Sequence, residues 1–148
     1  MTDPTKLDRL LDLRRHEEAR RTAELVLARQ AESDAATAGR KLTEQRAEAE
    51  NMADTLPGES VGALKTVRML IEQIDQSIQN ARTVQALASA TVAEKEEQLR
   101  EAEQRRDTLE RIVVPRHEHA RALQRMAEQK LEDEAALVQF RTRSRGGS

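Results

Sequence analysis

The chain has 148 residues, of which 35% are charged and 1% aromatic, and its formal net charge is −2. Few large apolar side chains are present to fill a thick core, and the balanced charge with one aromatic residue argues against nucleic acid as a partner. Cysteine is absent, no apolar run approaches the ~20 residues of a membrane span, and Met1–Pro4 does not resemble a secretory signal, so we expect a cytoplasmic protein.

A first helix is predicted over about 4–54. It opens at Asp3-Pro4, because Asp accepts hydrogen bonds from free amides and Pro is tolerated in the first turn. A leucine cluster follows, and the apolar stripe then nearly vanishes in the charged segment 14–21. Beyond it the stripe is thin and rich in alanine, so this helix should be the weaker partner of a pair. Its members are Ala23, Val26 or Leu27, Ala31, Ala35, Ala38, Leu42, Ala49 and Met52.

The segment 55–60 is predicted to be a turn. It contains the dipeptide Pro57-Gly58, a strong turn signal, and Ser60 can cap the helix that follows. A short connection between two apolar-striped helices predicts an antiparallel hairpin, in which facing residues have numbers that add to about 114.

A second helix is predicted over about 61–142, with one apolar position every 3.5 residues on average. This spacing is typical of a left-handed coiled coil, whereas low hydropathy alone would also fit a disordered chain. The same positions include Gln85, Lys95, Arg106, Arg116, Lys130 and Glu134. The apolar members are Leu64, Val67, Ile71, Ile74, Ile78, Ala81, Ala88, Val92, Leu99, Ala102, Leu109, Val113, Ala120, Leu123, Ala127 and Leu137.

The second helix is longer than the first, so its C-terminal part should overhang without an intramolecular partner. In the predicted hairpin the first helix ends opposite about residue 110, close to Pro115. Proline inside a helix removes a hydrogen bond, and the sequence leaves open a bend, a break or an uninterrupted helix. The overhang would span 116–142, followed by a flexible basic tail over 143–148.

The chain carries no convincing catalytic, metal or cofactor site. His117 and His119 point about 200° apart on a helix, so they cannot hold one ion together in the way that residues four apart do. Paired carboxylates need a pocket to separate their pKa values, and two helices provide none. We therefore expect neither an enzyme nor a bound cofactor.

Three segments resemble the flagellar export protein family FliJ. They are Leu7–Ala19 (LDRLLDLRRHEEA), Arg105–Arg111 (RRDTLER) and Glu128–Ala136 (EQKLEDEAA). The second segment is similar to the family's stretch rich in leucine and arginine, and the third to its acidic segment near the C-terminus. The related YscO group of virulence type III secretion shares the same plan.

The resemblance implies a bacterial protein with an all-α fold, an antiparallel two-helix coiled-coil hairpin similar to the central stalk (γ) subunit of rotary ATPases. It implies a non-catalytic stalk that enters the hexameric export ATPase, points its loop end at the export gate protein FlhA, and handles export chaperones. The protein would be a monomer in isolation, cytoplasmic and peripheral to the inner membrane at the export apparatus.

The resemblance also assigns residues to the two ends of the hairpin. It places Leu42, Leu70 and Ile74 at the gate contact, although Gln45 and Ala49 stand where the family carries aromatic residues. We hypothesise that a second set of apolar residues lies at the ATPase-ring end: Leu7, Leu10, Leu11, Leu13, Leu123 and Met126.

Two other functions stay open at this point. A YscO-like stalk of a virulence system would have the same architecture, and a generic coiled-coil scaffold would use the overhang to pair two chains. An elongated monomer in sedimentation favours a stalk over a dimerising rod.

Overall fold

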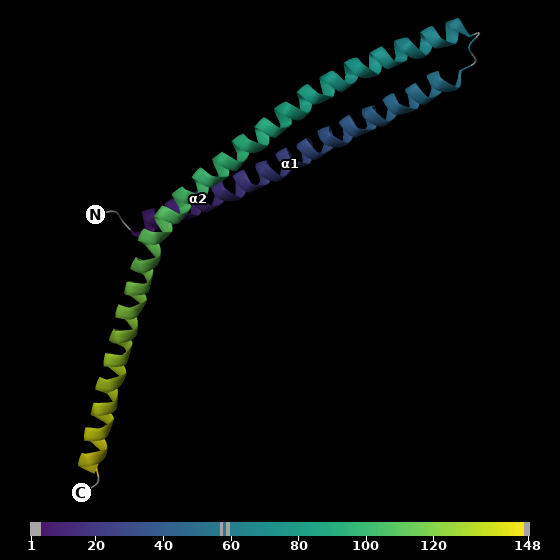
Figure 1. Cartoon of the computed structure of the whole chain (residues 1–148). Coiled ribbons are helices and arrows are strands. Elements are labelled where there is room, and N and C mark those ends of the chain that lie inside the picture. The colour runs from purple at the N-terminus through teal and green to yellow at the C-terminus, as the bar shows by residue number, and fades with distance from the viewer. Residues whose placement is uncertain (1–3, 57, 59, 147–148) are drawn as a thin grey trace. The chain divides into compact units, whose positions relative to one another are not determined.

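The computed structural model describes residues 4–56, 58 and 60–146 and contains two long helices, α1 over Pro4–Thr55 and α2 over Val61–Gly146 (Figure 1). The helices pack against each other, and the described residues include no strand. The all-α two-helix hairpin predicted from the sequence is therefore confirmed.

Hydrogen bonds at the end of α1 and at the start of α2 define the connection between the helices. The hydroxyl of Thr55, the last residue of α1, donates to the carbonyl oxygen of Met52 at 3.1 Å. The amide of Leu64 donates to the carbonyl oxygen of Ser60 at 3.1 Å, so Ser60 accepts the first hydrogen bond of α2, as expected for a cap residue. Pro57 and Glu59, within the predicted turn, lie outside the described residues.

The C-terminal end of α2 differs from the sequence prediction. A flexible tail was expected over 143–148, but the helix continues to Gly146, and residues 147–148 lie outside the described range. Arg143 and Arg145 are in the last turn of α2, where positive charge interacts favourably with the helix dipole. Helix α2 also continues through Pro115 without interruption.

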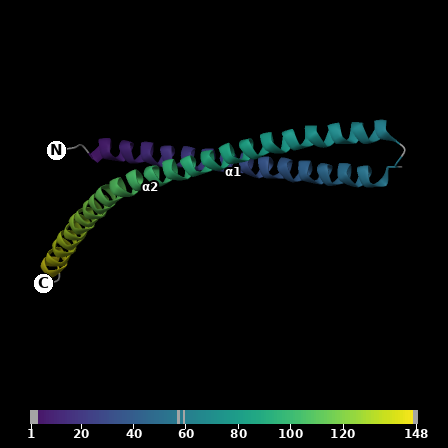
Figure 2. The same cartoon turned by 45° about the horizontal axis from the view of Figure 1, so that its top comes forward.

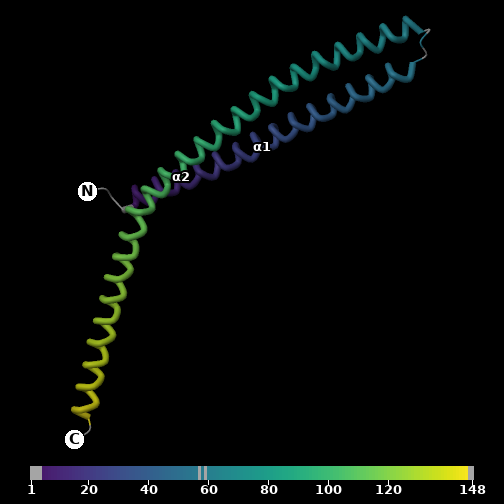
Figure 3. The backbone as a smooth tube through the Cα atoms, viewed as in Figure 1, coloured from purple at the N-terminus to yellow at the C-terminus, as the bar shows by residue number. Residues whose placement is uncertain are grey.

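The chain forms two units. The first, which we call the terminal unit, contains Met1–Arg15 and Gln104–Ser148; the second, the hairpin unit, contains His16–Glu103. In the hairpin unit, α1 and α2 lie side by side in both orientations of the molecule (Figures 2 and 3). Cross-helix contacts join Arg46 to Asp75 near the connection and Arg21 to Gln98 farther from it, so the helices are antiparallel.

The seam predicted for α2 is confirmed between Leu64 and Val113. Every apolar position of the predicted repeat in this range is buried or half-buried, and Lys95 and Arg106 are half-buried among them. Gln85 is the one exposed member. The buried members of the repeat are Val67, Ile74, Val92, Ala102, Leu109 and Val113.

The seam predicted for α1 is partly wrong. Val26 and Leu27 are 60% and 71% exposed, whereas Leu25 and Ala28 are buried and pack with Val92. The true seam alternates intervals of three and four residues without interruption from Leu7 to Leu56. It includes the half-buried polar residues Arg14, Glu18, Arg21, Glu32 and Arg46, whose long side chains cover the seam with their aliphatic stems.

The facing residues also differ from those predicted. Ion pairs and hydrogen bonds join residues across the two helices. The two residue numbers of each such pair add to between 119 and 125, rather than to about 114. Two effects raise the sum. The connection is centred after Pro57, and helical side chains lean toward the N-terminus of their own helix, so each spot on the surface is covered by a later residue.

The terminal unit has its own small core. Leu11 of α1 packs against Leu109 and Val113 of α2, and Leu7 packs against this cluster. Beyond Val113, α2 leaves the core, because every side chain from Val114 to Gly146 is exposed except that of Ala122.

Candidate partner-binding surfaces

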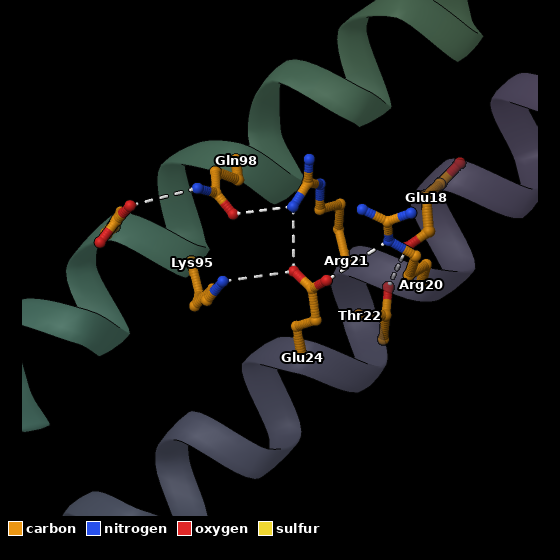
Figure 4. A network of polar contacts seen from close by, with 8 residues as sticks. Glu18, Arg20, Arg21, Thr22, Glu24, Lys95 and Gln98 are labelled. Atoms are coloured by element: carbon orange, nitrogen blue, oxygen red, sulfur yellow. Dashed lines mark hydrogen bonds and ion pairs between the residues drawn. The ribbon is translucent and has the colours of Figure 1, made fainter.

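A polar layer crosses the seam of the hairpin unit. Arg21 donates from Nη1 to Glu24 at 3.0 Å and to Gln98 at 3.1 Å, and Lys95 donates to the same Glu24 oxygen at 3.4 Å (Figure 4). The side chains of Arg21, Glu24 and Lys95 are each about three-quarters buried. The hydrogen bond from Arg21, and then the ammonium group of Lys95, lower the pKa of Glu24, although partial burial opposes them.

A second cross-helix pair lies nearer the connection. Arg46 donates from Nε to Asp75 at 2.5 Å and also forms an ion pair with Glu50 of its own helix. The hydrogen bond and the charge of Asp75 raise the pKa of Arg46 above its ordinary value. Because Arg46 is more than one-third exposed, this pair adds little stability, and its effect is mainly to select one alignment of the helices.

The terminal unit carries charged residues beside its core. Asp8 Oδ1 lies 2.6 Å from His117 Nε2, and Glu110 accepts from Arg15 at 3.4 Å and from Arg106 at 2.7 Å. A cleft beside these pairs is lined by Asp8, Leu11, Asp12, Arg15, Val113, Val114, His117, Glu118 and Arg121. Its lining includes both acidic and basic side chains, so it favours neither an anion nor a cation.

The described residues contain no group of three His, Cys, Asp or Glu side chains that could hold a metal ion. His117 pairs with Asp8 instead of converging with His119. The polar contacts of both units join charged groups that are partly open to solvent. Such contacts align helices, and none of them brings a nucleophile and a base into a shared pocket.

The leucine cluster of the first two turns is divided between the core and the surface. Leu11 is buried and Leu7 half-buried, so both belong to the core of the terminal unit. Leu10 and Leu13 are 38% and 65% exposed. Of the residues assigned to the ATPase-ring end, Leu10 and Leu13 on α1 thus present apolar surface.

The remaining two residues of this set lie on the exposed part of α2. Leu123 and Met126 are 54% and 69% exposed. Beyond Met126 the helix exposes four further large apolar side chains, which are those of Leu131, Leu137, Val138 and Phe140. From here on, the name overhang is used for the exposed segment 114–146, which carries all six.

The residues assigned to the gate contact are not equally accessible. Ile74 is 8% exposed and belongs to the seam, Leu42 is half-buried, and Leu70 is 41% exposed. Ile74 therefore offers little surface to a partner. Met69, beside Leu70, is 62% exposed and was missed by the sequence analysis, since its position lies outside the heptad repeat.

Leu25 was also missed, and a signal for it exists in the sequence. The strict alternation of three and four residues that starts at Leu7 and Leu11 leads through Arg14, Glu18 and Arg21 to Leu25 and Ala28. Requiring apolar residues at every step hides this seam.

No helix in the described part of the chain is long and apolar enough to cross a membrane. The sequence matches the family described as Flagellar FliJ protein over residues 3–145. No curated protein and no solved structure matches the sequence of this chain. The family match covers almost the whole of the two-helix hairpin, and the chain belongs to the FliJ family of flagellar type III export components.

Proposed function

We propose that the protein is a non-catalytic stalk of the flagellar export apparatus, which inserts the exposed end of its terminal unit into the hexameric export ATPase. The observation that carries this proposal is the overhang, a helix that continues from the core of the terminal unit with its apolar side chains exposed. Most of the stability of helices in proteins comes from packing of an apolar face, so a binding partner that covers the apolar side of the overhang would stabilise it.

The charge pattern of the overhang suits a ring of identical subunits. The segment carries seven Arg or Lys residues and five Asp or Glu residues; both signs occur between Arg116 and Glu134, and the charged residues after Glu134 are all Arg. Exposed ion pairs contribute little each, so a surface of mixed charge makes several weak contacts with the ring rather than one strong contact with a single subunit. A stalk that changes its orientation inside a ring needs such a surface.

The connection end of the hairpin unit is proposed to contact the export gate. Leu70 supplies exposed apolar surface there together with Met69, and Leu42 contributes a half-buried edge. Ile74 would support this surface from within the seam. The same end could hold export chaperones, which the family resemblance also implies. These contacts would place the protein in the cytoplasm, beside the inner membrane at the export apparatus.

ATP hydrolysis by the cognate export ATPase tests the stalk proposal. The native chain should raise the rate, and the double variant Leu123→Ala/Met126→Ala should lose most of this effect. The matched control is Val84→Ala/Leu87→Ala in the hairpin unit, where the two side chains are 55% and 65% exposed. The control should raise the rate as the native chain does. A native chain that leaves the rate unchanged would contradict the stalk proposal.

Binding to the cytoplasmic domain of the gate protein is a separate measurement. Met69→Ala/Leu70→Ala should weaken it, because both side chains are exposed and their removal leaves the seam intact. The exposed pair Val26→Ala/Leu27→Ala is the control. Equal binding by both double variants would remove the gate contact from the proposal.

A further inference from the structure

The overhang carries a heptad repeat that differs from the seam preceding it. Continuing the seam through Leu109, Val113, Arg116, Ala120 and Leu123 would lead next to Ala127. Four large apolar side chains instead follow a repeat that keeps the series Leu123, Lys130 and Leu137 and replaces the series of Ala127 by one that starts one position earlier, at Met126; Leu131 and Val138 lie outside it. This repeat alternates intervals of three and four residues through Leu123, Met126, Lys130, Asp133, Leu137 and Phe140.

All four apolar members of this shifted repeat are exposed, from 54% for Leu123 to 71% for Phe140. Leu123, Lys130 and Leu137 recur every seven residues and form one series. The second series, Met126, Asp133 and Phe140, recurs with the same period. Two such series are the pattern of a helix that packs against a second helix along this stripe.

The sequence of the repeat is complementary to itself in the antiparallel direction. When two antiparallel coiled-coil helices pair, the first series of one helix faces the second series of the other. Leu123 then meets Phe140 of the second copy, Met126 meets Leu137, and Lys130 meets Asp133. Every pairing occurs twice, because the two copies are related by a two-fold axis.

The charges select the antiparallel direction. In a parallel pair in register, Lys130 would meet Lys130 and Asp133 would meet Asp133, and both contacts would place like charges in the seam. In the antiparallel pair the same four side chains form two ion pairs, each between Lys130 of one copy and Asp133 of the other. Alanines at the flanks of the repeat, Ala122, Ala127 and Ala136, allow the two helices to approach closely.

We propose that the overhang binds the overhang of a second copy of this chain as an antiparallel two-helix coiled coil. The contact runs from Leu123 to Phe140, about 27 Å of helix. The contact has only six pairs of facing residues along the seam. Association should therefore be weak and should depend on protein concentration. The inference does not rest on the proposed function, and it revises the expectation of a monomer in isolation.

Charge reversal in the full chain, followed by sedimentation equilibrium over a range of concentrations, tests the proposal. Lys130→Asp and Asp133→Lys should each raise the dissociation constant of the dimer about tenfold, because each replaces two attractive pairs by two repulsive ones. The double variant Lys130→Asp/Asp133→Lys should restore dimerisation. Glu132→Lys is the matched control, since it adds the same positive charge one residue away and outside the repeat.

Cysteine substitution tests the direction of pairing, since the chain has no cysteine of its own. A mixture of Leu123→Cys and Phe140→Cys chains should form a mixed disulfide in mild oxidant, and Leu123→Cys alone should form no dimer. Cross-linking of Leu123→Cys to itself would overturn the antiparallel register.

Three results of the sedimentation experiment would overturn the proposal. They are a monomer at every concentration up to about 1 mM, a dimer unaffected by either single reversal, and a double variant that fails to restore the dimer. The ATPase measurement is made at a concentration low enough to keep the chain monomeric, so failure of the dimer and failure of the stalk proposal can be told apart.

Discussion

Glu24 is the residue at which a contact across the two helices meets contacts within α1. It accepts hydrogen bonds from Arg21 on its own helix and from Lys95 on α2, and these interactions lower its pKa. A carboxylate whose pKa is lowered in the folded state stabilises the protein at pH values above its ordinary pKa, which is 4.5 for Glu. This contribution disappears as the pH falls through the folded-state pKa.

Glu24→Gln should therefore destabilise the protein at neutral pH and have no effect in acid. Urea unfolding of both chains at a series of pH values between 2 and 7 measures the free energy of unfolding of each. The native chain should lose stability relative to the variant below about pH 4.5. A difference between native and variant chains that stays constant across the series would show that Glu24 acts through its shape rather than its charge.

Leu25 and Leu27 provide a matched comparison of seam and surface. Leu25 is 5% exposed and Leu27 is 71% exposed, two positions apart on the same helix. Leu25→Ala should lower the free energy of unfolding by about 2–3 kcal/mol, because it leaves a cavity in the seam. Leu27→Ala should change it by less than about 0.5 kcal/mol. Equal effects of the two substitutions in urea unfolding would contradict the seam described for α1.

At the scale of the element, α2 is a single helix although Pro115 interrupts its hydrogen bonding. Proline removes an amide donor and its ring presses on the preceding turn. The helix nevertheless continues, because Val113 lies in the core of the terminal unit and the long helical sequence on both sides favours one conformation.

Pro115→Ala should raise the free energy of local unfolding around Val113 by about 2 kcal/mol, since Ala restores the amide donor and removes the steric strain. Hydrogen exchange of the amides in 109–120 measures this change. Pro4→Ala is the control, because proline is tolerated at the first position of a helix, and it should leave exchange in this segment unaltered. Faster exchange in Pro115→Ala would contradict the expected cost of the proline.

The two helices differed in how well their sequences predicted them. The seam of α2 was predictable through Val113, because Val, Ile and Leu occupy most of its positions. In α1 polar residues such as Arg21 and Arg46 share the seam, and bulky residues such as Leu27 lie outside it. A search for apolar periodicity then selects the wrong face.

At the scale of the whole molecule, the fold and the family followed from the pattern of the chain, whereas the facing residues did not. The lean of side chains toward the N-terminus of each helix shifted every contact in the same direction, and residue counting from the turn neglects this lean. The candidate partner surfaces were found in part. Leu123 and Met126 are exposed as a partner contact requires, whereas Ile74 is buried in the seam.

The central claim is that the overhang is the part of the protein that engages the export ATPase. Hydrogen exchange of the full chain, at a concentration low enough to keep it monomeric, measures this directly with and without the ATPase hexamer. Amides in 123–146 should exchange rapidly in the isolated chain and become strongly protected in the complex, with little change in 61–92. Protection confined to 61–92, with the overhang still exchanging rapidly in the bound protein, would contradict the account.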